Sequence, residues 1–222
     1  MDTGIGNGKS YPGTAFDQLD TPFLARLEAA DFPAGLIDVV ITTHLHPDHV
    51  GWNTRQVAGK WLPTFPRARY LISRTEFEFA KPDPRRQRIF ADSFDPVTAT
   101  GQLELVDLRE EGVEVAPGLL LRPAPGHTPG QLSVEVSDAG RSALIGGDWL
   151  HHPAQLARPD WACSADVEAE QSERTRRGLL ARLARTENLL FGSHFAAPTA
   201  GLVRADGDAY RLAPVPPGPR PS

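Results

Sequence analysis

A dense cluster of metal-binding residue types directly follows a short apolar segment of this chain. Residues 36–42 are rich in β-branched side chains and are bounded by turn signals, which predicts a buried strand. Residues 43–51 come next, and Pro47 interrupts the hydrogen-bonding ladder, so we expect a loop that leads into a helix. This loop is predicted to form a metal site. Its candidate ligands are His44, His46, Asp48 and His49.

The spacing of these residues suits two neighbouring ions. Residues two apart in an extended loop point the same way, so His44 and His46 can converge on one ion. Asp48 and His49 lie just past the turn and can reach a second ion. Imidazoles suit zinc, iron and similar metals, while a carboxylate adds charge compensation and can favour a harder ion.

Three further candidate ligands lie at or beyond the ends of predicted strands. His127 occupies a turn-rich Gly-His-Thr-Pro-Gly segment at residues 126–130. Asp148 follows a predicted strand through two glycines, and His194 follows another through Gly-Ser. Layered proteins place functional side chains at these carboxyl ends, so we expect these residues to join the metal site.

The rest of the chain alternates short strands with a few helices. Thr21 is expected to cap a helix that begins at Pro22. Residues 81–96 are polar, which predicts a surface excursion over the site. Further strands are predicted at 69–73, 103–106, 113–115, 119–122, 132–136, 143–145 and 189–191, with helices at 74–80 and 167–185. This order favours a layered α/β or α+β sandwich, with one domain at 1–213 and a Pro-rich flexible tail at 214–222.

Composition disfavours several classes of partner. The formal net charge of -5 disfavours nucleic acid, which usually needs a basic face. No apolar stretch approaches the roughly 20 residues that span a bilayer, so we expect no membrane and a cytoplasmic location. The single cysteine, Cys163, excludes a disulfide within the chain and a cluster of thiolates, and it is expected to be a small buried hydrophobe.

Taken together, these motifs resemble the metallo-β-lactamase superfamily, and the resemblance covers nearly the whole chain. Residues 43–54 and 147–153 are most similar to its lactonase and organophosphate-hydrolase branch. The resemblance implies an α+β fold, an αββα sandwich with metals at one edge. In such hydrolases, strands precede the Asp-Thr-Gly turn that is residues 2–4 here, so the first N-terminal strands are expected to be missing.

The resemblance also implies a role for each ligand. His44, His46 and His127 would hold the first metal; Asp48, His49 and His194 would hold the second; Asp148 would bridge both. Two divalent ions are therefore expected, zinc first, with iron, manganese or cobalt as alternatives. The expected catalytic residues are Asp148, Asp48 and His151. His151 stands where the quorum-quenching lactonases have a tyrosine, which puts an acyl-homoserine lactone in doubt as the substrate. Asp2 is expected to orient a ligand by a hydrogen bond.

We expect a metal-dependent hydrolase of a lactone, ester or phosphotriester, in which a water between two ions loses a proton and attacks. The alternatives are a sulfur dioxygenase of the same fold with one iron, and an inactive truncated binding module. A nuclease is disfavoured by the acidic balance.

The expected partner is a small molecule with an apolar portion, and a homodimer is a further expectation. Trp52 and Trp149 flank ligand segments and are expected to wall an apolar pocket.

Overall fold

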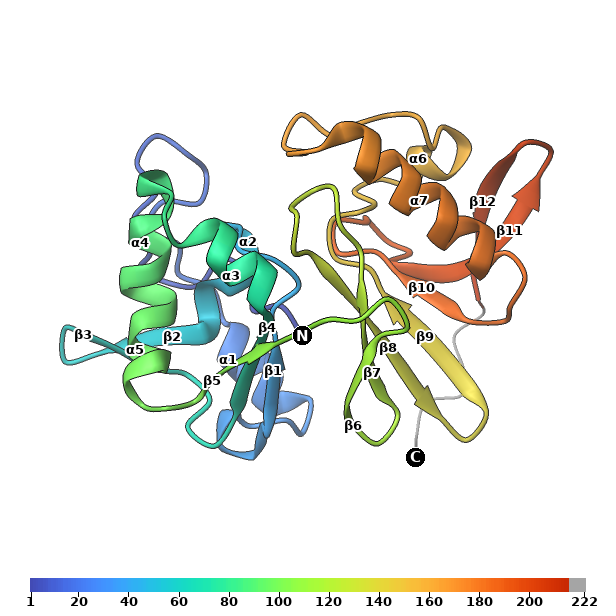
Figure 1. The fold of residues 1–222 in the computed structure, drawn as a ribbon. Coiled ribbons are helices and arrows are strands. Elements are labelled where there is room, and N and C mark those ends of the chain that lie inside the picture. Colours follow the sequence, from blue (N-terminus) through green and yellow to red (C-terminus); the bar gives the residue numbers. More distant parts are fainter. Residues whose placement is uncertain (216–222) are drawn as a thin grey trace. The chain divides into compact units, whose positions relative to one another are not determined.

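The computed structural model describes residues 1–215, within two compact units that comprise Met1–Asp107 and Leu108–Ser222 (Figure 1). Each unit combines a sheet with helices, and the predicted α+β class is confirmed. The single domain at 1–213 stays a prediction, and residues 216–222 of the expected tail lie outside the described residues.

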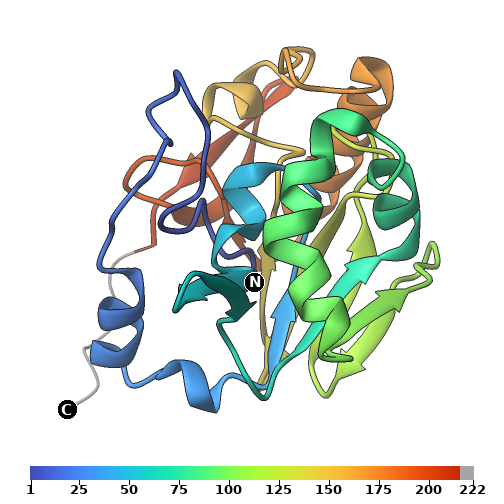
Figure 2. The ribbon, with the colours of Figure 1, turned by 90° about the vertical axis from the view of Figure 1, so that its left-hand side faces the viewer.

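The first unit contains a three-stranded parallel sheet in the order β1-β4-β5, together with a separate hairpin (Figure 2). The sheet strands are β1 (Val39–Ile41), β4 (Arg69–Ser73) and β5 (Leu103–Val106), and the hairpin strands are β2 (Thr54–Val57) and β3 (Lys60–Pro63). The helices are α1 (Phe23–Ala29), α2 (Pro47–Val50), α3 (Arg74–Ala80), α4 (Gln87–Ile89) and α5 (Asp95–Ala99). The predicted strand at 69–73 and helix at 74–80 are confirmed with these bounds.

Two local predictions in this unit are wrong. Residues 81–96 are mostly helical, because Phe90 and Phe94 are buried one helical turn apart against Phe77 of α3. A π-helical turn, Phe90–Phe94, joins α4 to α5 there. Pro22 rather than Thr21 caps α1, because the Thr21 hydroxyl donates to Oδ1 of Asn7 instead.

The second unit contains a seven-stranded sheet in the order β12-β11-β10-β9-β8-β7-β6. Its strands are β6 (Val113–Ala116), β7 (Leu119–Pro123), β8 (Leu132–Asp138), β9 (Arg141–Ile145), β10 (Leu189–Phe191), β11 (Ala200–Asp206) and β12 (Ala209–Ala213). The helices are α6 (Ala154–Ala157) and α7 (Ala169–Leu183). Only β9 and β10 pair in parallel, so the chain returns between them through the segment that carries both helices.

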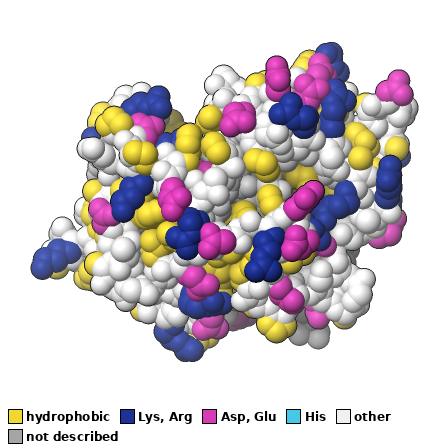
Figure 3. Space-filling view, in the orientation of Figure 1, with side chains coloured by type: hydrophobic (Ala, Val, Ile, Leu, Met, Phe, Trp, Pro, Cys, Tyr) yellow, Lys and Arg dark blue, Asp and Glu magenta, His cyan; other side chains and the backbone are white. Residues whose placement is uncertain are grey.

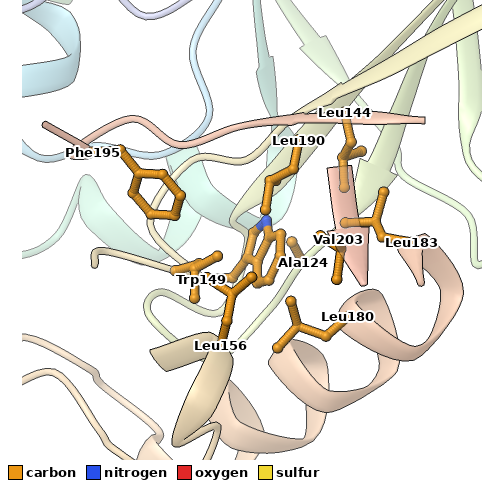
Figure 4. Packing of buried hydrophobic residues seen from close by; sticks show 10 residues of the cluster. Ala124, Leu144, Trp149, Leu156, Leu180, Leu183, Leu190, Phe195 and Val203 are labelled. Carbon is orange, nitrogen blue, oxygen red and sulfur yellow. The ribbon is translucent and has the colours of Figure 1, made fainter. Parts of the chain in front are cut away.

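Helix α7 packs on this sheet through its apolar face. Leu180 and Leu183 are buried against Leu144, Leu190 and Val203 of the strands (Figure 4). Burial of each such side chain stabilises the folded state by about 1.5–3 kcal/mol. This core fixes the ends of β9 and β10, after which Asp148 and His194 follow.

The hairpin β11–β12 was not predicted from the sequence. Its register pairs Asp206 with Ala209, which leaves Gly207 and Asp208 as a two-residue turn, and Gly207 has a positive φ of 62°. A Gly-Asp pair between two strand-like runs is a recognised hairpin signal, so the sequence did contain the information.

Charged side chains of both signs are interspersed on the face shown in Figure 3. Over residues 1–215, no helix is both long enough and apolar enough to cross a membrane.

Candidate metal centre

The first unit brings four predicted ligands together, here called the N-terminal cluster: His44, His46, Asp48 and His49. Nε2 of His44 lies 3.0 Å from Nδ1 of His46, and the rings of His44 and His49 have centroids 4.2 Å apart. Nε2 of His49 lies 3.5 Å from Oδ2 of Asp48. Strand β1 and the first turn of α2 position them, with Pro47 at the start of the helix.

Asp2 holds the other side of this cluster. Its Oδ2 lies 2.9 Å from Nδ1 of His49 and accepts a hydrogen bond of 2.8 Å from the Thr43 hydroxyl. The same hydroxyl lies 3.0 Å from Nδ1 of His44. The expected hydrogen bond between Asp2 and a candidate ligand is present, and it leaves Nε2 of both rings to face the cluster. That Asp2 orients a metal ligand stays a prediction.

The second unit brings together His127, Asp148 and His194, and adds His151; these four form the C-terminal cluster. Oδ2 of Asp148 lies 3.1 Å from Nε2 of His194, 3.2 Å from Nε2 of His151 and 3.6 Å from Nε2 of His127. Asp148 is buried, so its charge needs nearby compensation. His152 is exposed and its Nδ1 accepts from the backbone N–H of Ala154.

Asp166 contacts a candidate ligand and was not predicted from the sequence. Its Oδ1 lies 2.9 Å from Nδ1 of His127, and its side chain is fully buried. Burial acts to raise the pKa of Asp166, but the contact with His127 and a backbone N–H outweigh it and lower the pKa. The two residues are 39 positions apart, and no local pattern marks such a pair.

A glycine permits the close packing of this segment. Gly126 precedes His127 with a φ of 133°, and a Cβ there would lie 2.2 Å from the backbone nitrogen of Ser172 in α7. Glu168 also donates its backbone N–H to the Gly126 carbonyl at 2.9 Å. Only glycine fits this approach of the His127 loop to the start of the helix.

The prediction that Trp52 and Trp149 wall an apolar pocket is wrong. Trp149 is fully buried in the core of the second unit, among leucines of the sheet and of α7 (Figure 4). Trp52 is buried and stacks on Phe23 with ring centroids 5.2 Å apart. Both indoles serve packing because large aromatic rings gain most from burial.

The donor atoms of both clusters fit divalent metal ions. Ligand atoms around a tetrahedral zinc lie roughly 3.3 Å apart when zinc–nitrogen bonds are about 2.0–2.1 Å. The 3.0 Å between ring nitrogens of His44 and His46 is close to that separation. The opposite nitrogens of His49 and His127 each contact a carboxylate, as metal-binding histidines usually do.

The chain matches the model of a known protein family over most of its length. The family model of the metallo-beta-lactamase superfamily matches residues 2–192. The chain belongs to the metallo-β-lactamase superfamily. The fold and the resemblance predicted from the motifs are thereby confirmed. A comparison with curated proteins found no match.

Solved structures of this superfamily share the fold. A structure described as hydrolase AbOPH of the beta lactamase superfamily has a TM-score of 0.80 and 24% identity, over 98% of this chain and 75% of that one. AidC, a dizinc quorum-quenching lactonase with the product N-hexnoyl-L-homoserine, has a TM-score of 0.78 and 26% identity, over 98% and 75%. A probable metal-dependent hydrolase from Staphylococcus aureus has a TM-score of 0.79 and 24% identity, over 97% and 77%. The predicted enzyme class, a metal-dependent hydrolase, is confirmed together with its likeness to lactonases.

Proposed function

We propose that this metallo-β-lactamase-type chain hydrolyses a lactone, ester or phosphotriester with two divalent ions, zinc first among them. His44, His46 and His127 would hold one ion and Asp48, His49 and His194 the other, with Asp148 shared. Membership of the superfamily supports the joint use of the two clusters.

The observation that carries the proposal is the surroundings of Asp148. One carboxylate oxygen, Oδ2, has three imidazole nitrogens within 3.6 Å, from His127, His151 and His194. Imidazole nitrogens gathered around one buried carboxylate oxygen form a set of nitrogen and oxygen donors that suits divalent metal ions.

When bound, two such ions would acidify a water molecule and polarise the attacked carbonyl or phosphoryl oxygen. The residues of the chain would supply position and proton transfer. Asp148 can accept or relay a proton through Oδ2, and His151 lies 3.2 Å from that oxygen, within reach of the same proton. Asp2 and Asp166 would keep His49 and His127 in their orientations.

A cavity in the first unit fits the apolar portion of the substrate. It measures about 590 Å³ and includes Pro47, which adjoins the ligand Asp48 in sequence. Its walls combine apolar and polar side chains, among them Tyr11, Pro12, Pro84, Arg88 and Ile89. The hydroxyl of Tyr11, one of the lining residues, is buried and has no hydrogen-bond partner among residues 1–215.

Metal content and a substrate screen test the proposal together. We expect close to two metals per chain by mass spectrometry, and turnover of at least one of a lactone, a carboxyl ester or a phosphotriester. His46→Ala should lose both a metal equivalent and the activity, whereas His152→Ala, its control outside the clusters, should keep both. One iron per chain with oxygen consumption on a persulfide would support the dioxygenase instead. Absence of metal binding in a folded protein would support an inactive binding module.

A further inference from the structure

The only cysteine of the chain lies beside two histidines of the C-terminal cluster. The Sγ of Cys163 and one ring nitrogen each of His127 and His151 all lie within 4.8 Å of one another. Cys163 is half-buried, so the expectation of a small, fully buried hydrophobic side chain is wrong. All three residues belong to the second unit, so the distances between them do not depend on the first unit.

The loop that carries Cys163 is held in place. Asp166 accepts the backbone N–H of Cys163 through Oδ2 at 3.0 Å, and donates its own backbone N–H to the Cys163 carbonyl at 3.0 Å. The next residue, Val167, donates its N–H to the His127 carbonyl at 3.0 Å. Asp166 thus positions the sulfur and the His127 ring at the same time, which lowers the cost of bringing them onto one ligand.

Two details of the trio favour a cation. Nδ1 of His151 is buried and has no hydrogen-bond partner within the described part of the chain, while Nε2 of the same ring faces Asp148 at 3.2 Å. The backbone N–H of Ala165 points at Sγ of Cys163, with 3.5 Å between nitrogen and sulfur. The contact with Ala165 holds the sulfur in place, and a buried imidazole nitrogen without a partner favours a ligand there.

We propose that Cys163, His127 and His151 form a second kind of metal site, with two nitrogen donors and one sulfur donor, for a thiophilic divalent ion such as cadmium or excess zinc. Nitrogen and sulfur ligands of a tetrahedral ion lie roughly 3.3–3.8 Å apart. Side-chain movements of about 1 Å therefore bring the three donor atoms, now within 4.8 Å of one another, to that separation. Binding replaces the S–H bond by a sulfur–metal bond and releases one proton to solvent. No electron is transferred.

This site shares His127 with the ligand set proposed for hydrolysis. An ion bound to the trio takes that imidazole away from the hydrolytic set, so excess thiophilic metal should inhibit the enzyme. The metal-binding part of the proposal does not rest on the proposed function, because its readout is the bond to sulfur. The inhibition alone rests on it.

Cadmium titration of the full chain, followed by ultraviolet absorption, tests the site. Because the chain has one cysteine, any thiolate-to-cadmium charge-transfer band must come from Cys163. We expect the band to grow to saturation at one cadmium per chain and to be absent from Cys163→Ser. His151→Ala should weaken cadmium binding at the band by roughly tenfold or more, as loss of a ligand or its support does. The adjacent His152→Ala, as its matched control, should leave the band unchanged.

A folded wild-type protein that binds cadmium without the band would overturn the proposal, and so would equal titrations of wild type and Cys163→Ser. Near-ultraviolet circular dichroism of each variant checks the fold independently. If the band appears but no ester, lactone or phosphotriester is turned over, the cadmium site stands and the proposed hydrolysis fails. The opposite pattern, turnover without the band, rejects the thiolate site alone.

Discussion

Oδ1 of Asp166 lies 2.9 Å from Nδ1 of His127, and both side chains are buried. This pair joins the loop before helix α7 to the loop after β7, and it directs Nε2 of His127 toward Asp148 at 3.6 Å. A carboxylate behind a metal-binding imidazole sets the ring orientation and raises its basicity. We therefore expect Asp166 to hold the proposed ligand His127 in its orientation.

Replacing Asp166 should weaken the binding of one of the two proposed metal ions. Asp166→Asn keeps the size of the side chain but removes its charge, and we expect roughly 10–100-fold weaker binding of the ion assigned to His127. Competition with a chromophoric chelator measures the affinity. Asp160→Asn removes a carboxylate of the same unit whose partner is the exposed Arg158, and it should change nothing. Equal affinities for both variants would refute the supporting role.

Replacing Asp2 should weaken the binding of the other proposed ion. It contacts His49 and the Thr43 hydroxyl, so Asp2→Asn disturbs the N-terminal cluster while leaving His127 intact. We expect roughly 10–100-fold weaker binding of the second ion. At a free metal concentration that just fills both wild-type sites, Asp166→Asn and Asp2→Asn should each retain about one ion per chain. The double variant should retain neither ion. The exposed Asp31→Asn serves as the control. Loss of the same ion in both single variants would contradict the assignment.

Arg176 should be essential for the stability of the second unit. This fully buried guanidinium on α7 donates to the carbonyls of Trp149 at 2.9 Å, Pro159 at 2.6 Å and Trp161 at 2.9 Å. Arg176→Met leaves these acceptors unsatisfied, and we expect a loss of about 3–5 kcal/mol in the free energy of unfolding. Urea denaturation measures it. Arg177→Met, next in the helix, breaks only an exposed pair with Glu173 and should cost about 0.5 kcal/mol or less.

Lys9 should make stability depend on pH above neutrality. Burial lowers its pKa to about 8 from the ordinary value of 10.5, although Asp92 opposes the shift. Between these two pH values the unfolded chain binds more protons than the folded chain, so the Lys9 contribution to stability rises with pH. We expect the unfolding free energy of wild type minus that of Lys9→Met to rise from pH 8 to 10.5. The exposed Lys60→Met, compared in the same way, should show no such rise. A flat or falling difference for Lys9 would contradict the shift.

Much of the fold and of the candidate site followed from local patterns. The strand at 69–73 and the helix at 74–80 were predicted with the observed bounds, because alternation and helical spacing report hydrogen bonding between near neighbours. Residues 81–96 were misjudged, since their polar residues masked the buried Phe90 and Phe94.

The sequence by itself determined which side chains can bind metal and that they follow strand ends, because ligand chemistry and turn residues are local properties. Only the tertiary structure decided what supports them. Asp166 reaches His127 across 39 positions, and Arg176 reaches Trp149 across 27. The place of Cys163 beside His151 belongs to the same class. Such pairs depend on how the loop before α7 packs against the sheet, and that packing sums many weak contacts that no short window of sequence contains.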